Sequence, residues 1–525
     1  MILKNNFFLL NLFFFFLSFA GSVYQSQFIY DPFHWGLSQS SIDLFSNLEP
    51  YKEIFIHYGF FYTLSNSLIL KIFNNDLIYT MYLSSLFFSL GNFFLCHLGY
   101  NKLRIKTVYF LPLLLFLIHP FANHPWYNYQ FYFLIVLSIF FLIEDKKFSL
   151  LFTGILVSLS CLVYENFIYL GILLIFIIFF LKKNSKKKYL LLSGFFLPQV
   201  IFHLYLYNNN LHPYWIKTFW LNEIFLIIYD LTFFELVNAY LKSLLAKSIF
   251  NFFTEPYYFI FLIILIVNFY FFISFIFFKK KNFRNKNINI YLFIFSLVCL
   301  FSYASTLHKL NIFRFSTGPI IGVVVMFYFI ERNFSKYKNH LVTLILVILG
   351  SSSLVPIKQE NNRFFPLFED ITNNYSSKNL VFFKSQKWRK ETWDVINQIN
   401  KKSELISLNC PKVNNFLNFT EDAFFYMIAN QYINSNQYLF WYEDKKFYRL
   451  LYKHFNKNVN LLLEDLNKLE NGIIFFNLRD INHLRKKINF KNFDYIEFPY
   501  SYQQKRKGLI IPNNCLKKLT NGNIK

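Results

Sequence analysis

The chain has 525 residues, of which 55% are hydrophobic, 23% are aromatic and only 16% are charged, and its formal net charge is +24. A soluble core does not need this much apolar surface, so an ordinary soluble protein is excluded. Within residues 1–356, most of the lysines lie in short loops between apolar runs. That placement is the orientation signal of membrane insertion, so the positive charge does not indicate nucleic-acid binding.

Apolar runs predict an α-helical polytopic membrane protein with about 11 spans, because several of them reach the roughly 20 residues that cross a bilayer. The runs cover residues 6–23, 77–99, 107–120, 128–143, 148–163, 166–181, 189–207, 257–278, 289–305, 313–330 and 340–356. The first run lacks a small-residue cleavage site before Tyr24, so we expect a retained span rather than a signal peptide.

A shorter apolar run, residues 60–73, decides the orientation of every later span. If it crosses the membrane, the most basic loops, such as 182–188 and 279–286, fall on the outer side and the positive-inside rule is violated. We therefore predict that 60–73 is an interfacial helix in the first outer loop, 24–76. This places the N-terminus inside and the C-terminus outside.

Two further outer segments follow from this orientation. A loop over 208–256 contains an amphipathic piece at 234–245, and residues 357–525 form a soluble domain after the membrane domain, 1–356. The pattern in the C-terminal domain predicts a small α/β unit. Its expected strands are 380–384, 404–409, 472–477 and 493–498, and its expected helices are 391–401, 421–433, 442–455 and 462–469.

Cysteine is sparse, and two of the five cysteines, Cys410 and Cys515, belong to the C-terminal domain. A disulfide between them is compatible with a location outside the cytoplasm, but the sequence leaves the pairing open. No spacing of cysteine and histidine indicates a zinc site, so no metal ligands are assigned.

The spans contain almost no ionisable residues, which disfavours a secondary transporter, because proteins that move ions usually bury charged groups mid-membrane. The polar residues gather instead at the outer ends of the spans, and this placement indicates a site at the outer membrane face. The candidates are Asp31, His34, Glu49, Glu53, His57, His119, Asn123, His124, Glu165, Lys309 and Arg314.

Each candidate has a structural alternative. Asp31 either caps the helix expected near His34 or acts as a general base that removes a proton from an acceptor hydroxyl. His34 either binds a metal or a phosphate, or simply lies at the interface. Glu165 lies in a turn between two apolar spans that is too tight to be well solvated. Lys309 and Arg314 either hold a lipid-linked phosphate or contact lipid headgroups.

Three motifs carry a resemblance to a known family. They are Asp31-Pro32-Phe33-His34-Trp35-Gly36 after the first span, the interfacial helix over 58–73, and Ile312-Phe313-Arg314-Phe315 followed by Gly318-Pro319. This pattern resembles the GT-C superfamily of integral membrane glycosyltransferases, especially the bacterial RgtA/B/C/D-like and aminoarabinose-transferase-like members. The likeness covers about residues 1–356, together with an outer C-terminal domain of the kind that many members carry.

The resemblance implies a multi-pass enzyme of the bacterial inner (plasma) membrane with a cytoplasmic N-terminus and an extracytoplasmic C-terminal domain. The donor would be a polyprenyl-phosphate sugar, the acceptor an envelope lipid, glycan or protein, and the configuration would invert. The catalytic candidates are Asp31 as the base, with His34 and Glu165, and the substrate-binding candidates are Glu53, His57, His124, Lys309 and Arg314.

The chain departs from the family pattern at two places. Residues 119–126 lack the further acid of many relatives, and Asp31 has no neighbouring glutamate. No cofactor is therefore assigned, although Asp31 and His34 leave a shared divalent metal open. Two other classes stay open as well. One is an envelope polysaccharide polymerase or another lipid-linked glycan protein, which the 208–256 loop permits, and the other is a non-enzymatic membrane scaffold.

Overall fold

The chain is described here by a computed structural model. The structure describes residues 2–521 except for 29–37, 46–47, 53, 55, 57, 145, 147, 182–184, 217, 219–232, 278–285, 305, 308–309, 311, 354–374, 377–379, 389, 412, 414, 420–427, 429–471, 478–481, 483–492 and 503–504. All structural statements below concern the described residues.

Every apolar run of the sequence forms helix, which confirms a polytopic helical fold. The helices are α1 (Ile2–Ser26), α5 (Ile78–His97), α6 (Leu111–Ile118), α7 (Tyr127–Glu144), α8 (Ser149–Val163), α9 (Ile168–Leu181), α10 (Ser185–Asn208), α13 (Tyr257–Phe277), α14 (Lys286–Ala304), α16 (Val323–Asn333) and α17 (Lys338–Ser353). Among the described residues, five helices are long and apolar enough to cross a membrane, and five more apolar helices have 10–17 residues. Residues 313–330 are divided between a short helix, α15 (Ile312–Phe315), the 3-10 turn η5 (Pro319–Gly322) and α16.

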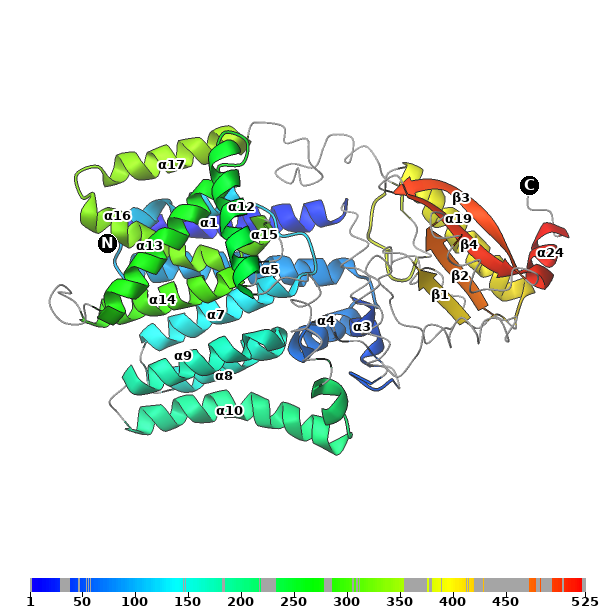
Figure 1. Cartoon of the computed structure of the whole chain (residues 1–525), viewed down its shortest axis with the longest axis horizontal. Helices are drawn as coiled ribbons and strands as arrows, with labels where there is room; N and C mark the ends of the chain where they lie inside the picture. Colours follow the sequence, from blue (N-terminus) through cyan, green and yellow to red (C-terminus); the bar gives the residue numbers. More distant parts are fainter. Residues whose placement is uncertain are drawn as a thin grey trace.

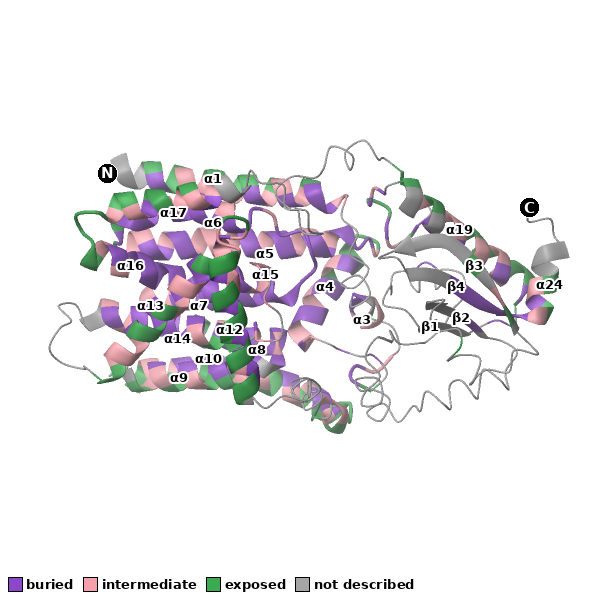
Figure 2. Cartoon of the chain, turned by 45° about the horizontal axis from the view of Figure 1, so that its top comes forward, coloured by how far each residue is buried: buried purple, intermediate pink, exposed green. Residues whose placement is uncertain are grey.

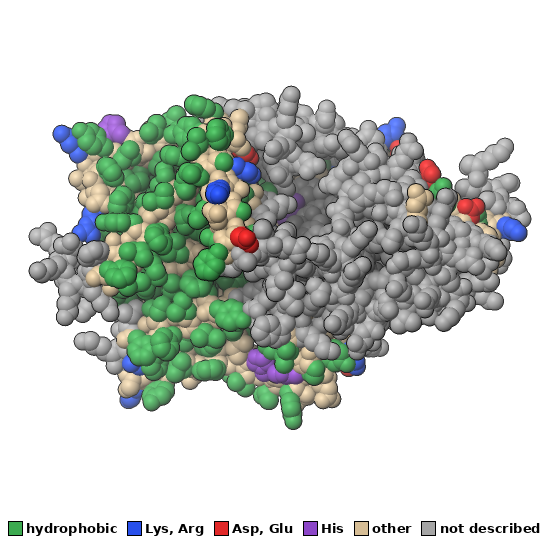
Figure 3. All heavy atoms as spheres, in the orientation of Figure 1, with side chains coloured by type: hydrophobic (Ala, Val, Ile, Leu, Met, Phe, Trp, Pro, Cys, Tyr) green, Lys and Arg blue, Asp and Glu red, His purple; other side chains and the backbone are tan. Residues whose placement is uncertain are grey.

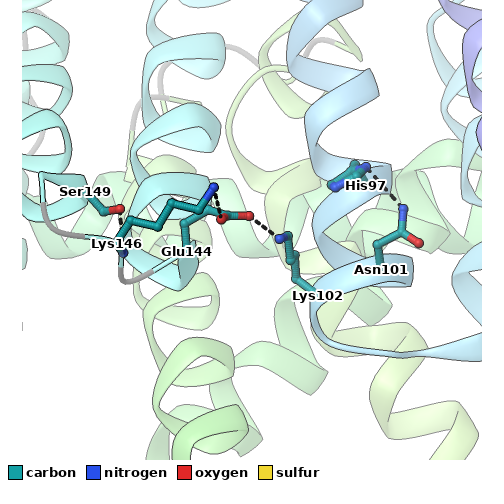
Figure 4. A network of polar contacts seen from close by, with 6 residues as sticks. All are labelled: His97, Asn101, Lys102, Glu144, Lys146 and Ser149. Atoms are coloured by element: carbon teal, nitrogen blue, oxygen red, sulfur yellow. Dashed lines mark hydrogen bonds and ion pairs between the residues drawn. The ribbon is translucent and has the colours of Figure 1, made fainter.

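These helices pack side by side as a bundle, with hydrophobic side chains over much of its surface (Figures 1 and 3). The N-terminus lies at the end of the bundle opposite the C-terminal unit, as the predicted orientation requires (Figure 1). At the end of the bundle that holds the N-terminus, the Glu144 carboxylate accepts a hydrogen bond from Lys102 and forms an ion pair of 3.3 Å with Lys146. Two predicted inner loops therefore meet there (Figure 4). Which side of a membrane each end faces stays a prediction.

Two helices differ from the rest in position. Helix α4 (Phe60–Ile72), the predicted interfacial helix, packs on α3 (Gln39–Asp43), α5 and α8 at the end of the bundle that faces the C-terminal unit (Figure 1). Helix α12 (Phe233–Phe250) runs across the direction of the bundle helices in both views (Figures 1 and 2). It buries Leu236, Tyr240 and Leu244 and exposes Phe234 and Phe250, so the amphipathic piece predicted at 234–245 is confirmed as part of a longer helix.

The C-terminal unit consists of a four-stranded sheet with helices α19 (Lys390–Asn409) and α24 (Asn513–Asn521). The strands are β1 (Asn415–Phe419), β2 (Gly472–Asn477), β3 (Phe493–Tyr502) and β4 (Lys505–Pro512), in the order β1-β2-β4-β3. Strand β1 is parallel to β2, whereas the β2–β4 and β3–β4 pairs are antiparallel. A small α/β unit is therefore confirmed.

Some of the expected elements of this unit were wrong. The strands at 472–477 and 493–498 and the helix at 391–401 are confirmed, but residues 404–409 continue α19, because Ile396, Ile399 and Ile406 lie on one buried helical face. Residues 380–384 form turns, in which the Phe382 carbonyl accepts from the Leu77 amide at 3.0 Å. The helices predicted at 421–433, 442–455 and 462–469 fall almost entirely outside the described residues.

A disulfide joins Cys410, directly after α19, to Cys515 in α24, with 5.7 Å between the two Cα atoms. The pairing that the sequence left open is thus present. It closes a long segment, since the two cysteines are 105 residues apart, and such a loop constrains the unfolded chain strongly. Structural disulfides persist in oxidising compartments, which agrees with the predicted outer location of this unit.

The C-terminal unit contacts the bundle through the turn between α4 and α5 and through the end of α1. The Asp76 carboxylate accepts from the Ser385 hydroxyl at 2.6 Å and from the Ser385 amide at 3.1 Å. The Lys387 amide donates to the Gln27 carbonyl at 2.7 Å, and the Gln386 side chain donates to the Ser26 carbonyl at 3.2 Å. The start of the first outer loop is therefore bonded to the C-terminal unit.

Candidate functional site

Glu165 is the candidate residue that the structure defines best. It begins a single 3-10 turn, η3 (Glu165–Phe167), between α8 and α9, and only 6% of it is exposed. Its carboxylate accepts a hydrogen bond of 2.6 Å from the Tyr51 hydroxyl. Burial raises the pKa of Glu165 to about 7, although Tyr51, Trp215 and the Phe60 amide act in the opposite direction by favouring the charged form. The sequence-based expectation of poor solvation is confirmed.

Tyr51 brings the first outer loop to this acid. It is fully buried, and its ring lies 6.4 Å from that of Phe60 and 6.5 Å from that of Phe202. Its φ angle is +64°, a left-handed conformation that costs a bulky residue on the order of 1–3 kcal/mol. Burial and the charge of Glu165 raise the pKa of Tyr51 well above its usual value, so the hydroxyl keeps its proton and acts as the donor. A strained, buried tyrosine of this kind persists only where its surroundings hold it.

The first outer loop also contacts the end of α8, at Gly59. The Gly59 amide donates to the Val163 carbonyl at 2.8 Å, and a Cβ atom at Gly59 would lie 2.1 Å from the Leu162 carbonyl oxygen. No other residue fits this close backbone approach. Tyr51 and Gly59 together attach the end of the first outer loop to the α8–α9 turn.

A second polar cluster joins the second outer loop, residues 119–126 between α6 and α7, to the segment before α16. The buried His119 ring lies 2.5 Å from the Ser316 hydroxyl through Nδ1 and 3.4 Å from the Tyr129 hydroxyl through Nε2. Its ring also meets Phe313 edge to face at 4.9 Å. His124, 9% exposed, contacts Phe313 at 5.9 Å. These contacts bring the predicted residue His124 beside the segment that carries Arg314.

The guanidinium carbon of Arg314 lies 5.5 Å from the centroid of the Trp126 ring. Trp126 contacts Tyr127, and the Tyr127 ring lies 4.6 Å from Tyr164 and 4.1 Å from Tyr58 of the first outer loop. A continuous series of aromatic contacts therefore leads from Arg314 to the residue directly before Glu165.

Helix α1 holds the second outer loop through a buried polar stripe. Ser18 donates to the Pro120 carbonyl at 2.6 Å, Ser22 accepts from the Ala122 amide at 2.9 Å, and the Asn123 side chain donates to Gln25 at 2.5 Å. A few polar residues are tolerated within a span, so the sequence pattern does not single these residues out. In the structure, they fix the loop that carries His119 and His124.

Of the eight residues to which the sequence assigns a catalytic or substrate-binding role, Glu165, His124 and Arg314 can be placed. Asp31, His34, Glu53, His57 and Lys309 lie outside the described residues, so their roles stay predictions. Within the described ranges, no group of three or more histidine, cysteine, aspartate or glutamate side chains could hold a metal ion.

Sequence reasoning missed Tyr51, Trp126, Tyr127 and Ser316 as members of the site. Their partners lie far away in the chain, and aromatic residues are too common here to single out, with 75 phenylalanines and 37 tyrosines. For Tyr51, the only local sign was the preceding proline in an acidic loop segment.

No protein-family model matches the chain, and no curated protein matches it in sequence. Among solved structures, the chain is similar to the crystal structure of ArnT from Cupriavidus metallidurans bound to undecaprenyl phosphate, with 10% sequence identity, 98% coverage of each chain and a TM-score of 0.44. At this identity and TM-score, the similarity assigns neither an activity nor a ligand to the present chain.

Proposed function

We propose that the protein is a membrane glycosyltransferase that transfers a sugar from a polyprenyl-phosphate donor to an envelope lipid, glycan or protein on the extracytoplasmic face. The observation that carries this proposal is the packing of Arg314 on Trp126, at the bundle end where both early outer loops meet. The protein would be a multi-pass component of a bacterial inner membrane, with its N-terminus in the cytoplasm. The disulfide between Cys410 and Cys515 supports the outer location of the C-terminal unit.

Arg314 is suited to the donor phosphate. A guanidinium is planar, always charged and able to donate two parallel hydrogen bonds to phosphate oxygens. The face of Trp126 restricts the orientation of the cation and adds a favourable cation–π interaction. A cation at this position would stabilise the negative charge that develops on the leaving polyprenyl phosphate.

Asp31 is the proposed general base. It would take the proton of the acceptor hydroxyl while the hydroxyl oxygen attacks the anomeric carbon, and the bond from that carbon to the phosphate oxygen would break with its electron pair on the phosphate. A direct attack from the opposite face inverts the configuration. Glu165 is buried and hydrogen-bonded to Tyr51 of the first outer loop. This position favours a role in holding the loop rather than direct contact with substrate.

Mass spectrometry of envelope glycans tests the proposal in strains that carry the native gene, a deletion, Asp31→Asn or Arg314→Gln. We expect the deletion to remove one monosaccharide mass and both variants to reproduce the loss at unchanged protein level. Native behaviour of Asp31→Asn would disprove the assignment of the base. An unchanged glycan profile after deletion, in a strain shown to express the protein, would favour a scaffold.

A further inference from the structure

Two histidines lie together at the outer end of α10, separate from the contacts of Arg314. His203 occupies the last turns of α10, and His212 follows the end of this helix at Asn208. The His203 Nδ1 and His212 Nε2 atoms are 3.3 Å apart, and the ring centroids are 5.1 Å apart with the planes inclined by 44°. Histidine side chains reach the surface at this end of α10 (Figure 3).

The backbone that joins the two histidines is well defined. Asn210 has a φ angle of +55°, and the Leu211 amide donates to the Leu206 carbonyl at 2.8 Å, which turns the chain back at the end of α10. Leu206 and Leu211 are buried on either side of this turn. The helix end therefore brings His212 back onto His203 without help from a ligand.

The separation of the two nitrogens matches one edge of a metal coordination shell. Zinc binds imidazole nitrogen at about 2.0–2.1 Å, and in a tetrahedral site two such nitrogens are about 3.3–3.4 Å apart. The same separation also fits a weak N–H···N hydrogen bond between the rings, and zinc binding distinguishes the two.

We propose that His203 and His212 form a two-histidine binding site for a zinc ion. The other two positions of a tetrahedral ion would be filled by water or by an anionic group, because no third histidine, cysteine, aspartate or glutamate side chain joins the pair within the described ranges. Such a site differs from a closed structural site, in which four protein ligands hold the ion.

The site is coupled to the first outer loop by packing. Trp215, whose ring centroid lies 5.0 Å from that of His203, belongs to the apolar cluster that also contains Tyr51, Leu206 and Leu211. Trp215 also acts on the pKa of Glu165. A zinc ion that fixes His212 would therefore restrict the side-chain positions in the part of this cluster that faces Tyr51.

The test is zinc binding to the full-length, untagged protein in detergent micelles, measured by competition with a chromogenic chelator. We expect one equivalent of zinc, at least a tenfold weaker association in His203→Ala and in His212→Ala, and no additional loss in the double variant. Binding should also weaken below pH 6, where protons compete for the imidazoles. Cobalt added in place of zinc should give the visible absorption of a tetrahedral site.

The matched control is His340→Ala, which removes an exposed histidine from α17, far along the chain from the pair. This variant should bind zinc like the native protein. Metal-free melting curves of all variants show whether each one is folded. If folded His203→Ala and His212→Ala bind zinc as tightly as the native protein, or if the native protein binds none, the proposal is wrong and the two rings form only a hydrogen bond.

Discussion

The buried carboxyl of Glu165 makes stability depend on pH in a defined direction. Its pKa rises from an ordinary 4.5 to about 7 in the folded protein. Below pH 4.5 both the folded and the unfolded chain hold this proton. Between pH 4.5 and about 7 the folded chain binds more protons than the unfolded chain, so stability falls as the pH rises, and above about pH 7 the loss is complete.

The size of this effect follows from the shift. At about 1.4 kcal/mol per pKa unit, the total is roughly 3 kcal/mol. Glu165→Gln removes the charge and keeps an oxygen that can accept from Tyr51. With an unfolding entropy of about 2 cal/mol/K per residue, 3 kcal/mol shifts the melting temperature of 525 residues on the order of 3 °C. We therefore expect the variant to melt a few degrees above the native protein at pH 8.5, and the difference to shrink to below ~1 °C at pH 5.

The assay is a thermal melt of purified protein in detergent, with native and variant compared at each pH so that effects of all other groups cancel. Tyr51→Phe is the companion variant. It removes the donor of the 2.6 Å hydrogen bond, so it should lower the melting temperature most at high pH, and less in the Glu165→Gln background. If the difference in melting temperature between the native protein and Glu165→Gln stays constant from pH 5 to 8.5, the idea of a buried carboxyl with a raised pKa is refuted.

Three further changes test other parts of the structure. Gly59→Ala should destabilise the protein by about 1–3 kcal/mol in thermal melts, because the new Cβ meets the Leu162 carbonyl, whereas Gly350→Ala, with open space at its Cβ, should not destabilise it. Cys410→Ser, or reduction, should lower the stability of the C-terminal unit by about 4 kcal/mol, seen as faster proteolysis of that unit. Asp76→Ala removes the acceptor of Ser385 and should speed protease release of the C-terminal unit from the bundle, and an unchanged digestion pattern would show that this contact does not hold the two parts together.

The sequence predicted the helices of the bundle well because length and apolar composition decide them locally. Each apolar run became helix, and the run at 60–73 became a separate helix, α4. The predicted secondary structure was wrong where contacts with distant parts of the chain determine the local fold. Residues 380–384 have the composition of a strand, but they turn because Phe382 and Ser385 bond to the start of α5. Residues 404–409 were expected to form a strand, but Ile406 is their only β-branched or aromatic residue, and the spacing of the buried isoleucines continues a helix.

The candidate site was predictable only in part, for the same reason. The poor solvation of Glu165 follows from two apolar runs separated by a short turn, and the structure confirms it. Its partner Tyr51 is 114 residues away, and no local pattern marks a tyrosine that adopts a left-handed conformation. The cation–π pair of Arg314 and Trp126 likewise joins segments that are distant in sequence.

The first outer loop is held at both ends by different parts of the chain. Its start is bonded to the C-terminal unit through Gln27 and Lys387, and its end is bonded to the α8–α9 turn through Tyr51 and Gly59. Asp31 lies between these anchors in sequence. If Asp31 is the base, its position depends on both anchors, since a catalytic group needs placement within fractions of an ångström. Asp76→Ala removes the acceptor of Ser385, two residues before Lys387, and so loosens the part of the C-terminal unit that forms the first anchor. This change is remote from the chemistry and should therefore lower the transfer rate at constant protein level. An unchanged rate would show that the C-terminal unit has no part in positioning the base.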